Sequence, residues 1–542
     1  MADKPIILTP EDVQRIMGKD AQRNNILAAK MVADIVKTTL GPKGMDKMLV
    51  SPVGDIIVTN DGVTILEEMQ IEHPAAKMMV EIAKTQETEV GDGTTTAVML
   101  AGQLLENAER LLDKKIHPTV ITKGYRLASE KSQEILKELA LKITAENEDV
   151  LRQIAMTAMT GKGAEDAKEN FADIIVRAVK QIQGANGVDV SDIKIEKSKG
   201  DGIQDTRLIP GIVFDKEKIS IEMPQVVKEA RIALLDLPLE LKNLEIDTKV
   251  SISTPDQLQG FIDQEERLIR SMISKIKAAN ANVVFCQKGI DDFAQYLLAK
   301  EKIYACRRIA KSDMEKIAKA TNAKIVSNLN ELSPNELGYA DEVREIKHGD
   351  DSLTYVTGCK NPKALTILIH GATEHVIDEI ERAIKDGLGD VISALKSGLV
   401  VPGGGAIEIE LARRLREFGQ GFSGREQLAI EEFASALECV PSTLAENAGL
   451  DPIDVLTELK ARHDAGDKNI GINLLKNKIE NSLEARIIEP LKIKSQAISS
   501  ASDVAIMILR IDDVIASSGG KGGSAPGGMS GAMRGMPSGM DY

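Results

Sequence analysis

The sequence Gly91-Asp92-Gly93-Thr94-Thr95-Thr96-Ala97-Val98 places one carboxylate between two glycines and three hydroxyls before an apolar stretch. Apolar residues then recur at steps of three and four as far as Leu112, which is typical of one buried helix face. Residues 93–96 are therefore expected at a helix N-terminus, where free N–H groups and the positive end of the helix dipole attract anions. The glycines permit close approach of a ligand, and Asp92 is suited to hold Mg2+. The stretch predicts either a site for phosphate and metal or a capped helix after a flexible turn.

The chain has 542 residues, which is too many for one compact core, so two to four domains are expected. Hydrophobic residues make up 43% and charged residues 28%, as in an ordinary globular protein. Tryptophan is absent and aromatic residues make up only 3%, so aliphatic residues and methionine must fill the core. The net charge of −15 argues against a broad surface for nucleic acid or for anionic membranes.

The four cysteines lie far apart and form no C-x-x-C pair, so neither a disulfide framework nor a zinc site is expected. The first nine residues lack the basic and apolar segments of a secretory signal. No apolar run reaches the ~18 residues needed to span a bilayer. We expect a cytoplasmic protein without nucleic-acid or membrane partners.

Apolar periodicity divides the chain into helical ends and a mixed middle. Residues 1–143 are mostly helical, with helices expected at 20–40, 75–90 and 95–115 and a hairpin at 48–60. Strands alternate with helices at about 214–367, which predicts an α/β domain. Mostly helical sequence returns after residue 403 and continues to 515. Because both ends have the same character, the middle is expected to be inserted into a discontinuous outer domain.

The segment at 244–262 differs from the helix that follows it. Residues 268–276 have the spacing of a helix packed on the α/β domain. At 244–262 the apolar residues are sparse and alternate with polar ones, which favours an arm that contacts other chains. The apolar residues of this arm are Leu244, Ile246, Val250, Ile252, Leu258, Phe261 and Ile262.

Four further stretches have chemistry suited to phosphate and water, although each alone is more often structural. They are Leu40-Gly41-Pro42-Lys43-Gly44, Asn60-Asp61-Gly62, Gly161-Lys162-Gly163 and the helical carboxylate Asp386. Lys43 does not belong to a Walker loop, because the G-x-x-x-x-G-K-[ST] spacing is absent. An ordinary P-loop ATPase is therefore excluded.

Taken together, these motifs resemble the group II chaperonins, the family of the archaeal thermosome and the eukaryotic cytosolic chaperonin. The similar stretches run in order along almost the whole chain, at 40–47, 59–66, 91–96, 403–405, 445–449 and 509–513. The tail rich in glycine and methionine is also similar to those of archaeal members, which favours a thermosome-type homo-oligomer.

The resemblance implies a multidomain α+β fold. A discontinuous, mostly helical equatorial ATPase domain is expected at 1–143 and 403–519, and a small intermediate hinge domain at 144–213 and 368–402. An α/β apical domain at 214–367 is expected to carry a helical protrusion at about 244–270 that acts as a lid, and 520–542 form a disordered tail. Two stacked rings would enclose unfolded or partly folded proteins. The hairpin around 51–55 would pair with terminal strands of a neighbouring subunit, for which 511–515 and 6–8 are the candidates.

The resemblance also implies roles for single residues around ATP and Mg2+. Asp92 is expected to ligate the metal, Asp386 to orient or deprotonate the attacking water with the assistance of Asp61, and Lys162 to sense the γ-phosphate. Asp386 lies in the hinge part, so it would reach the nucleotide only when the hinge closes. The remaining nucleotide contacts are Gly93, Thr94, Thr95 and Thr96 at the β- and γ-phosphates, Leu40, Gly41 and Pro42 near the α-phosphate, and Gly404, Asn473 and Glu489 at the base and ribose.

Two other classes of protein are compatible with parts of the pattern. A small-molecule kinase or ATP-dependent ligase would need an acceptor site beside the γ-phosphate, and the sequence has no concentrated His, Cys and Arg set for one. A ring scaffold with vestigial nucleotide binding is opposed by the retention of both Asp92 and Asp386.

Overall fold

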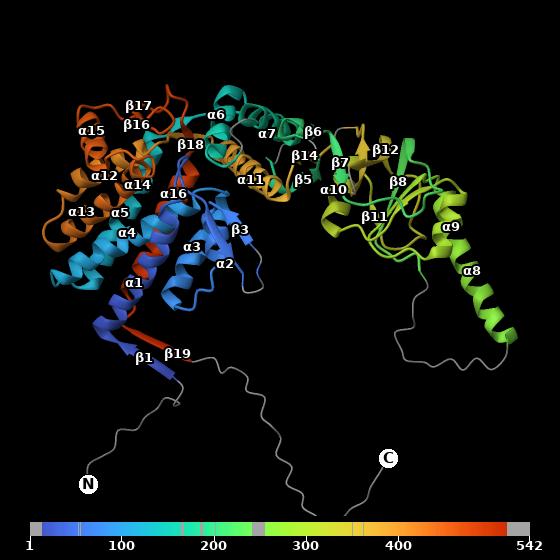
Figure 1. Ribbon diagram of the computed structural model, residues 1–542, viewed down its shortest axis with the longest axis horizontal. Helices are drawn as coiled ribbons and strands as arrows, with labels where there is room; N and C mark the ends of the chain where they lie inside the picture. Colours follow the sequence, from blue (N-terminus) through green and yellow to red (C-terminus); the bar gives the residue numbers. More distant parts are fainter. Residues whose placement is uncertain are drawn as a thin grey trace, which may run out of the picture.

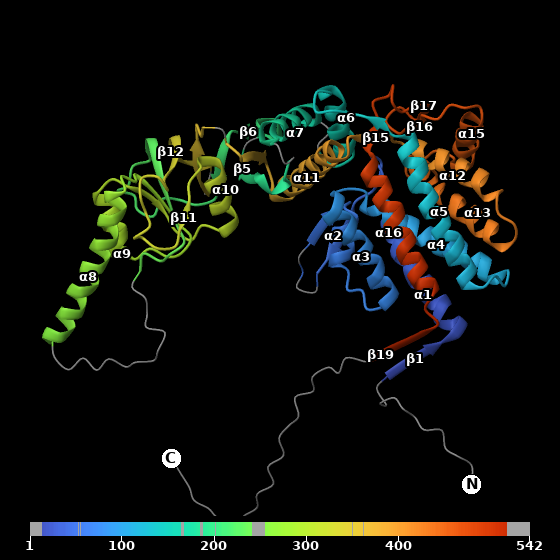
Figure 2. The ribbon, with the colours of Figure 1, turned by 180° about the vertical axis from the view of Figure 1, so that it is seen from behind.

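A computed structural model of the chain describes residues 13–51, 54, 56–163, 167–184, 188–200, 202–240, 255–348, 351–360 and 362–517. Helices from both ends of the sequence lie side by side at one end of the elongated molecule, and strands and helices from its centre lie at the other (Figures 1 and 2). The architecture combines helices with several separate sheets, so the prediction of a mixed α+β structure is confirmed.

The helical end is built around one helix that is buried on most of its sides, α4 (Thr94–Asp113). Its neighbours α1 (Gly18–Lys37), α3 (Pro74–Val90) and α16 (Leu491–Leu509) pack on it, and a Cβ added at Gly102 would lie 2.4 Å from the Cβ of Ala33 on α1. This close approach requires glycine at position 102. The other helices here are α2 (Gly62–Glu68), α5 (Pro118–Leu139), α12 (Ala406–Gly419), α13 (Arg425–Leu437), α14 (Cys439–Asn447) and α15 (Pro452–Asp464).

Short strands accompany these helices. The predicted hairpin is confirmed as β2 (Lys47–Val50) paired with β3 (Ile56–Thr59). The candidate terminal strand at 511–515 is present as β19 (Asp513–Ser517), which pairs antiparallel with β1 (Val13–Met17) of the same chain, whereas residues 6–8 lie outside the described residues. The expectation of helical sequence after residue 403 missed three short strands, β16 (Ile470–Asn473), β17 (Lys478–Asn481) and β18 (Ile488–Pro490), the last of which forms a sheet with β15 (Leu399–Pro402) and β4 (Leu141–Lys142).

A smaller group of elements lies between the two ends of the molecule (Figure 1). It contains α6 (Glu148–Met159), α7 (Lys168–Ile182) and the long α11 (Glu374–Ser397), with a sheet of β5 (Ile193–Lys199), β14 (Leu365–Gly371) and β6 (Arg207–Ile209). Short 3-10 turns occur at Val190–Asp192 and Ile203–Asp205. The side chain of Thr373 caps the start of α11, and Gly398 ends it in the left-handed region.

The far end contains a mixed sheet with strand order β10-β9-β8-β12-β13-β7, and β11 beside β8. Helices alternate with the strands of this sheet between β8 and β11, as the sequence predicted. The elements are β7 (Gly211–Phe214), β8 (Val226–Leu235), α8 (Pro255–Ala278), β9 (Val283–Cys286), α9 (Asp292–Lys300), β10 (Tyr304–Cys306), α10 (Lys311–Thr321), β11 (Ile325–Val326), β12 (Gly338–His348) and β13 (Asp351–Thr357).

The helix α8 extends beyond the sheet it packs on (Figure 1). Ile269, Ile273 and Ile276 are buried, which confirms the core packing expected for 268–276, but Leu268 is 48% exposed and does not share it. Leu268 lies one position before Ile269, so it falls outside the helix face that the spacing of Ile269, Ile273 and Ile276 defines. Of the arm residues, Leu244, Ile246, Val250 and Ile252 lie outside the described residues, and the side chains of Leu258, Phe261 and Ile262 at the start of α8 are likewise not described.

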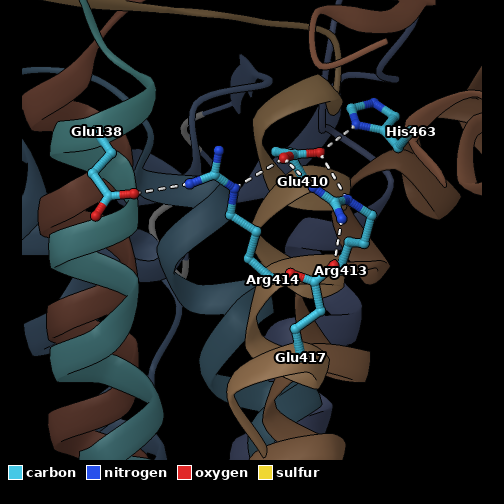
Figure 3. A network of polar contacts seen from close by, with 6 residues as sticks. All are labelled: Glu138, Glu410, Arg413, Arg414, Glu417 and His463. Atoms are coloured by element: carbon cyan, nitrogen blue, oxygen red, sulfur yellow. Dashed lines mark hydrogen bonds and ion pairs between the residues drawn. The ribbon is translucent and has the colours of Figure 1, made fainter. Parts of the chain in front are cut away.

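Glu410 on α12 is fully buried and contacts three basic side chains at once (Figure 3). Its carboxylate accepts hydrogen bonds from Arg413 at 2.7 Å and Arg414 at 3.0 Å, and its other oxygen lies 3.1 Å from Nδ1 of His463. Burial tends to raise the pKa of Glu410, but hydrogen bonds from His463, Arg413 and Arg414 lower it to about 2. Arg414 also donates to Glu138, so this network joins α12 to α5 and α15.

Replacing Glu410 by glutamine should lower the free energy of unfolding by about 3–5 kcal/mol, because the largely buried guanidinium groups of Arg413 and Arg414 lose their counter-charge. Guanidinium unfolding measures this loss, and Glu417→Gln is the control, since Glu417 also contacts Arg413 but is 60% exposed. The folded-state pKa lies below the ordinary 4.5, so the contribution is complete above pH 4.5 and disappears as pH falls towards 2. The stability difference between the native protein and Glu410→Gln should therefore shrink across that interval, and equal effects of the two variants would contradict the assignment.

Candidate functional site

A cavity of about 830 Å3, here called the Asp92 cavity, lies where the helical end meets α6 and α7. Its volume is within the range of small-molecule sites. The stretches that line it come from both halves of the sequence, and include residues 39–42, 60–62, 92–96, 160–162, 404–405, 472–475, 485–487 and 489. Folding thus collects most of the predicted site residues around one space.

The start of α4 forms one wall of the cavity. Gly93 precedes the helix in the left-handed region at φ 80°, and Thr94 begins it, as the sequence predicted. The Gln86 amide donates to the carbonyl oxygens of Asp92 at 2.9 Å and Ile493 at 3.3 Å, which fixes the turn against α16. The N–H groups of the first turn therefore border the cavity, and this geometry favours an anion there.

Lys162 joins two predicted carboxylates that are far apart in the sequence. Its ammonium donates to Asp386 at 2.6 Å and contacts Asp92 at 3.3 Å. Burial raises the pKa of Asp386, and although Lys162 opposes this, the carboxylates of Asp92 and Asp61 add to it, so that the pKa reaches about 7. Burial opposes the charge of Lys162, but Asp386 and Asp92 outweigh it and raise its pKa. Among the described residues that line the cavity Asp386 is absent, and its carboxylate contacts the lining residue Lys162.

The loop at residues 40–42 and the turn at 60–62 form the neighbouring wall. The amide of Asn447 donates to the carbonyl oxygen of Leu40 at 2.9 Å, which holds the end of α1. A Cβ at Gly161 would lie 2.4 Å from Cα of Pro42, so the Lys162 loop rests directly on this wall. The carboxylate of Asp61 accepts from N–H and Oγ1 of Thr64 and caps α2, so in this structure it has the structural role of a turn and a cap.

Gly404, Asn473 and Glu489 also line the cavity. The side chain of Asn473 is already bonded within the protein, because its amide donates to Glu480 at 2.7 Å and its oxygen accepts from the backbone of Leu475 at 3.1 Å. Burial raises the pKa of Glu489, and the Lys494 ammonium at 2.7 Å opposes this shift.

Sequence reasoning missed several charged residues of the cavity, and two of them, Lys494 and Asp390, interact with predicted site residues. Lys494 bridges Glu489 and the buried Glu408, at 2.7 and 2.9 Å. Asp390 is 2% exposed and follows Asp386 by four residues on α11. Side chains four residues apart lie near each other on a helix, so the spacing from Asp386 could have identified Asp390 as a further candidate.

The residues present fit a nucleotide-bound magnesium ion. No group of three or more His, Cys, Asp and Glu side chains in the described ranges has the arrangement of a metal centre. Magnesium, however, is commonly held by one or two carboxylates together with phosphate oxygens, and Asp92 lies beside the anion-favouring start of α4. The donor set suits a metal that arrives with a phosphate ligand.

Comparison with known proteins gives a family for this geometry. Residues 32–518 match the TCP-1/cpn60 chaperonin family. The chain belongs to that family. It is 56% identical to a thermosome subunit of Methanopyrus kandleri over 95% of both chains, and 55% identical to thermosome subunit beta of Archaeoglobus fulgidus over 97% of this chain and 98% of the relative. A thermosome subunit of Methanocaldococcus jannaschii is 54% identical over 97% of this chain and 99% of its own.

The resemblance to archaeal group II chaperonins is therefore confirmed, and the alternatives of a small-molecule kinase, a ligase or a vestigial scaffold are not favoured. Within the described ranges, no helix has the length and hydropathy that crossing a membrane requires.

Gly93→Ala should destabilise the protein more than Gly449→Ala, although both glycines have positive φ, at 80° and 73°. Each substitution costs about 1–2 kcal/mol for the left-handed backbone. The Cβ at position 93 would also lie 2.7 Å from a methyl group of Ile493, whereas nothing lies within 4 Å at position 449. Thermal unfolding compares the two, and equal midpoints would contradict the close contact of the Asp92 turn with α16.

Proposed function

We propose that this chain is the subunit of a ring-shaped molecular chaperone that binds Mg2+ and ATP in the Asp92 cavity and uses ATP hydrolysis to enclose and fold non-native proteins. The observation that carries the proposal is the contact of Lys162 with Asp92 at 3.3 Å and Asp386 at 2.6 Å, beside the start of α4. Phosphoryl transfer depends on positioning and on charge neutralisation, and this site offers both.

In this proposal Asp92 holds the magnesium ion, which supplies positive charge to the phosphates when bound. The first-turn N–H groups of Thr94 to Thr96, with Gly93 before them, bind the β- and γ-phosphates. Leu40, Gly41 and Pro42 line the nucleotide near the α-phosphate. Gly404, Asn473 and Glu489 border the base and ribose, and Asn473 acts through its loop because its side chain is engaged with Glu480.

Asp386 is proposed to accept the proton of the attacking water, with Asp61 nearby. Its pKa of about 7 suits a base at neutral pH. Lys162 binds the γ-phosphate as a point charge in place of its present carboxylate partners. That exchange releases the carboxylate of Asp386 towards the cavity. Because Asp386 lies on α11, movement of α11 towards the cavity is linked to hydrolysis.

The proposed domain layout keeps the boundaries expected from the sequence. The equatorial ATPase domain comprises 1–143 and 403–519, the intermediate domain 144–213 and 368–402, and the apical domain 214–367, with 520–542 as a tail. Separate buried clusters support it, since one is drawn from 26–136 and 401–509 and others from within 212–364. The protrusion at about 244–270, with its apolar residues from Leu244 to Ile262, acts as the lid.

Ring assembly is proposed to use the hairpin β2–β3 and the ribbon β1–β19 at the helical end. A two-stranded ribbon is marginal by itself and has free edges. On the hairpin β2–β3, Met48 and Val50 are 68% and 65% exposed, and Ile56 and Val58 also face solvent. We propose that identical subunits cover these apolar side chains and pair their edges in a double ring. Subunits named alpha and beta occur in one organism among the relatives, so mixed rings are the alternative that the mass of the purified assembly tests.

Asp386→Ala should retain ATP binding and lose most turnover, by about a hundredfold or more, because the base for the attacking water is removed. Phosphate release at steady state and calorimetric titration with a non-hydrolysable ATP analogue separate the two effects. Asp378→Ala on the same helix is the control, since its partner is Lys197 outside the cavity. Near-normal turnover of Asp386→Ala would refute this role.

Deletion of residues 244–266 should leave ATPase activity intact and abolish encapsulation. The deletion spares Ile269, Ile273 and Ile276, through which α8 packs on its sheet, so the remaining fold is expected to persist. Protection of a bound, unfolded substrate from added protease measures enclosure. A protected substrate inside the shortened protein would argue against a lid in this segment.

A further inference from the structure

Asp390 lies on α11 one turn after Asp386, but the two acids have different surroundings. The carboxylate of Asp386 is bonded to Lys162 and does not line the Asp92 cavity. Asp390 does line it, is 2% exposed, and its Oδ1 is buried without a hydrogen-bond partner. Of these two acids, Asp390 is therefore the one that faces the space proposed for the nucleotide.

Backbone packing holds Asp390 beside the Asp92 turn. A Cβ added at Gly91 would lie 3.4 Å from Cα of Gly389, and a Cβ at Gly389 would lie 3.1 Å from the carbonyl oxygen of Val90. Two backbones thus meet without intervening side chains, at the residues that precede Asp390 and Asp92. Their relative position is set by main-chain contact rather than by flexible side chains.

The charges around Asp390 are mostly negative. Burial is the main cause that raises the pKa of Asp390 well above its usual value, and Asp92, Asp386 and Glu489 add to it, while Lys162 opposes it. The hydrogen bonds of Lys162 go to Asp386 and Asp92. A buried carboxyl oxygen without a partner costs about 1–3 kcal/mol, and at Asp390 this oxygen belongs to a residue that lines the Asp92 cavity, where a ligand can satisfy it.

The nature of that ligand follows from charge. A phosphate is itself anionic and would be repelled by the carboxylate of Asp390. A divalent cation bound to the phosphates has the opposite sign and would lie close to Asp92, the acid with the strongest influence on Asp390. Magnesium is commonly held by one or two carboxylates together with phosphate oxygens, so Asp92 and Asp390 are sufficient protein ligands for it.

We propose that Asp390 is a second carboxylate ligand, with Asp92, of the divalent cation that accompanies the nucleotide, directly or through one water. The inference rests on the proposed function of the Asp92 cavity. Because Asp386 and Asp390 share one rigid helix, this contact also fixes the distance of Asp386 from the bound phosphates. The cation then links α11 to the start of α4, and it does so only when nucleotide is present.

The test is Mn2+ binding to the assembled protein with saturating ADP, followed by electron paramagnetic resonance. Asp390→Asn keeps the shape of the side chain and removes its charge, and it should weaken Mn2+ binding about tenfold or more. Asp378→Asn is the matched control, with the same substitution on the same helix and a partner outside the cavity, and it should bind Mn2+ as the native protein does.

Equal Mn2+ affinity of Asp390→Asn and the native protein would overturn the inference, even if turnover falls. Absence of ADP-dependent Mn2+ binding to the native protein would instead overturn the proposed function. If the Asp390→Asn protein does not assemble, Asp390→Ser is the second variant to test. Anomalous scattering from Mn2+ and ADP in crystals of the native protein needs no variant, and a metal too far from Asp390 for one water to bridge would also contradict the assignment.

Discussion

One ammonium group contacts two carboxylates at the place where the helical end, the Lys162 loop and α11 meet. Lys162 reaches Asp92 and Asp386, which lie 70 and 224 positions away in the sequence. Each partner is on a different element, and all three side chains are about one-quarter to one-third exposed. A partly buried charge contact of this kind is strong enough to hold a geometry, yet an anionic ligand can compete for the ammonium. Under the proposed function, the γ-phosphate is that competitor.

The same arrangement occurs a second time in the wall of the Asp92 cavity. Lys494 lies between Glu408 and Glu489, at 2.9 and 2.7 Å, and is more deeply buried than Lys162. Two ammonium groups thus balance four carboxylates, and Asp390 adds a fifth acid whose Oδ1 has no hydrogen bond. Around these two ammonium groups the acids outnumber the cations, and under the proposed function this local balance favours a triphosphate that enters with a divalent cation.

Glycines set distances around the cavity, because they allow backbones to touch. Gly161 rests on the backbone of Pro42, and Gly389 rests on the carbonyl oxygen of Val90, each at a distance that a larger side chain would enlarge. Such contacts are stiff, since main-chain atoms cannot move aside as side chains do. The glycine-rich motifs are therefore close together in space although they are scattered along the sequence.

Much of this protein was determined by local sequence. The period of apolar residues predicted α3, α4 and the β2–β3 hairpin, because helix and strand faces repeat over a few residues. The order of short motifs predicted the family, and the glycine–threonine stretch predicted an anion-favouring helix start. Local pattern missed the strand that carries Asn473, which is only four residues long and has no clear alternation.

Tertiary structure alone decided which charges meet. The sequence predicted that Asp386 lies on a helix. It did not predict that Lys162 donates a hydrogen bond to Asp386 while Asp390, one turn later, lines the cavity. The sequence placed Asp61 on a turn, but it did not show that the carboxylate of Asp61 caps α2. Nor did it indicate that β19 pairs with β1. Burial and the partners of a charge depend on segments hundreds of residues apart, and no local pattern encodes how those segments pack.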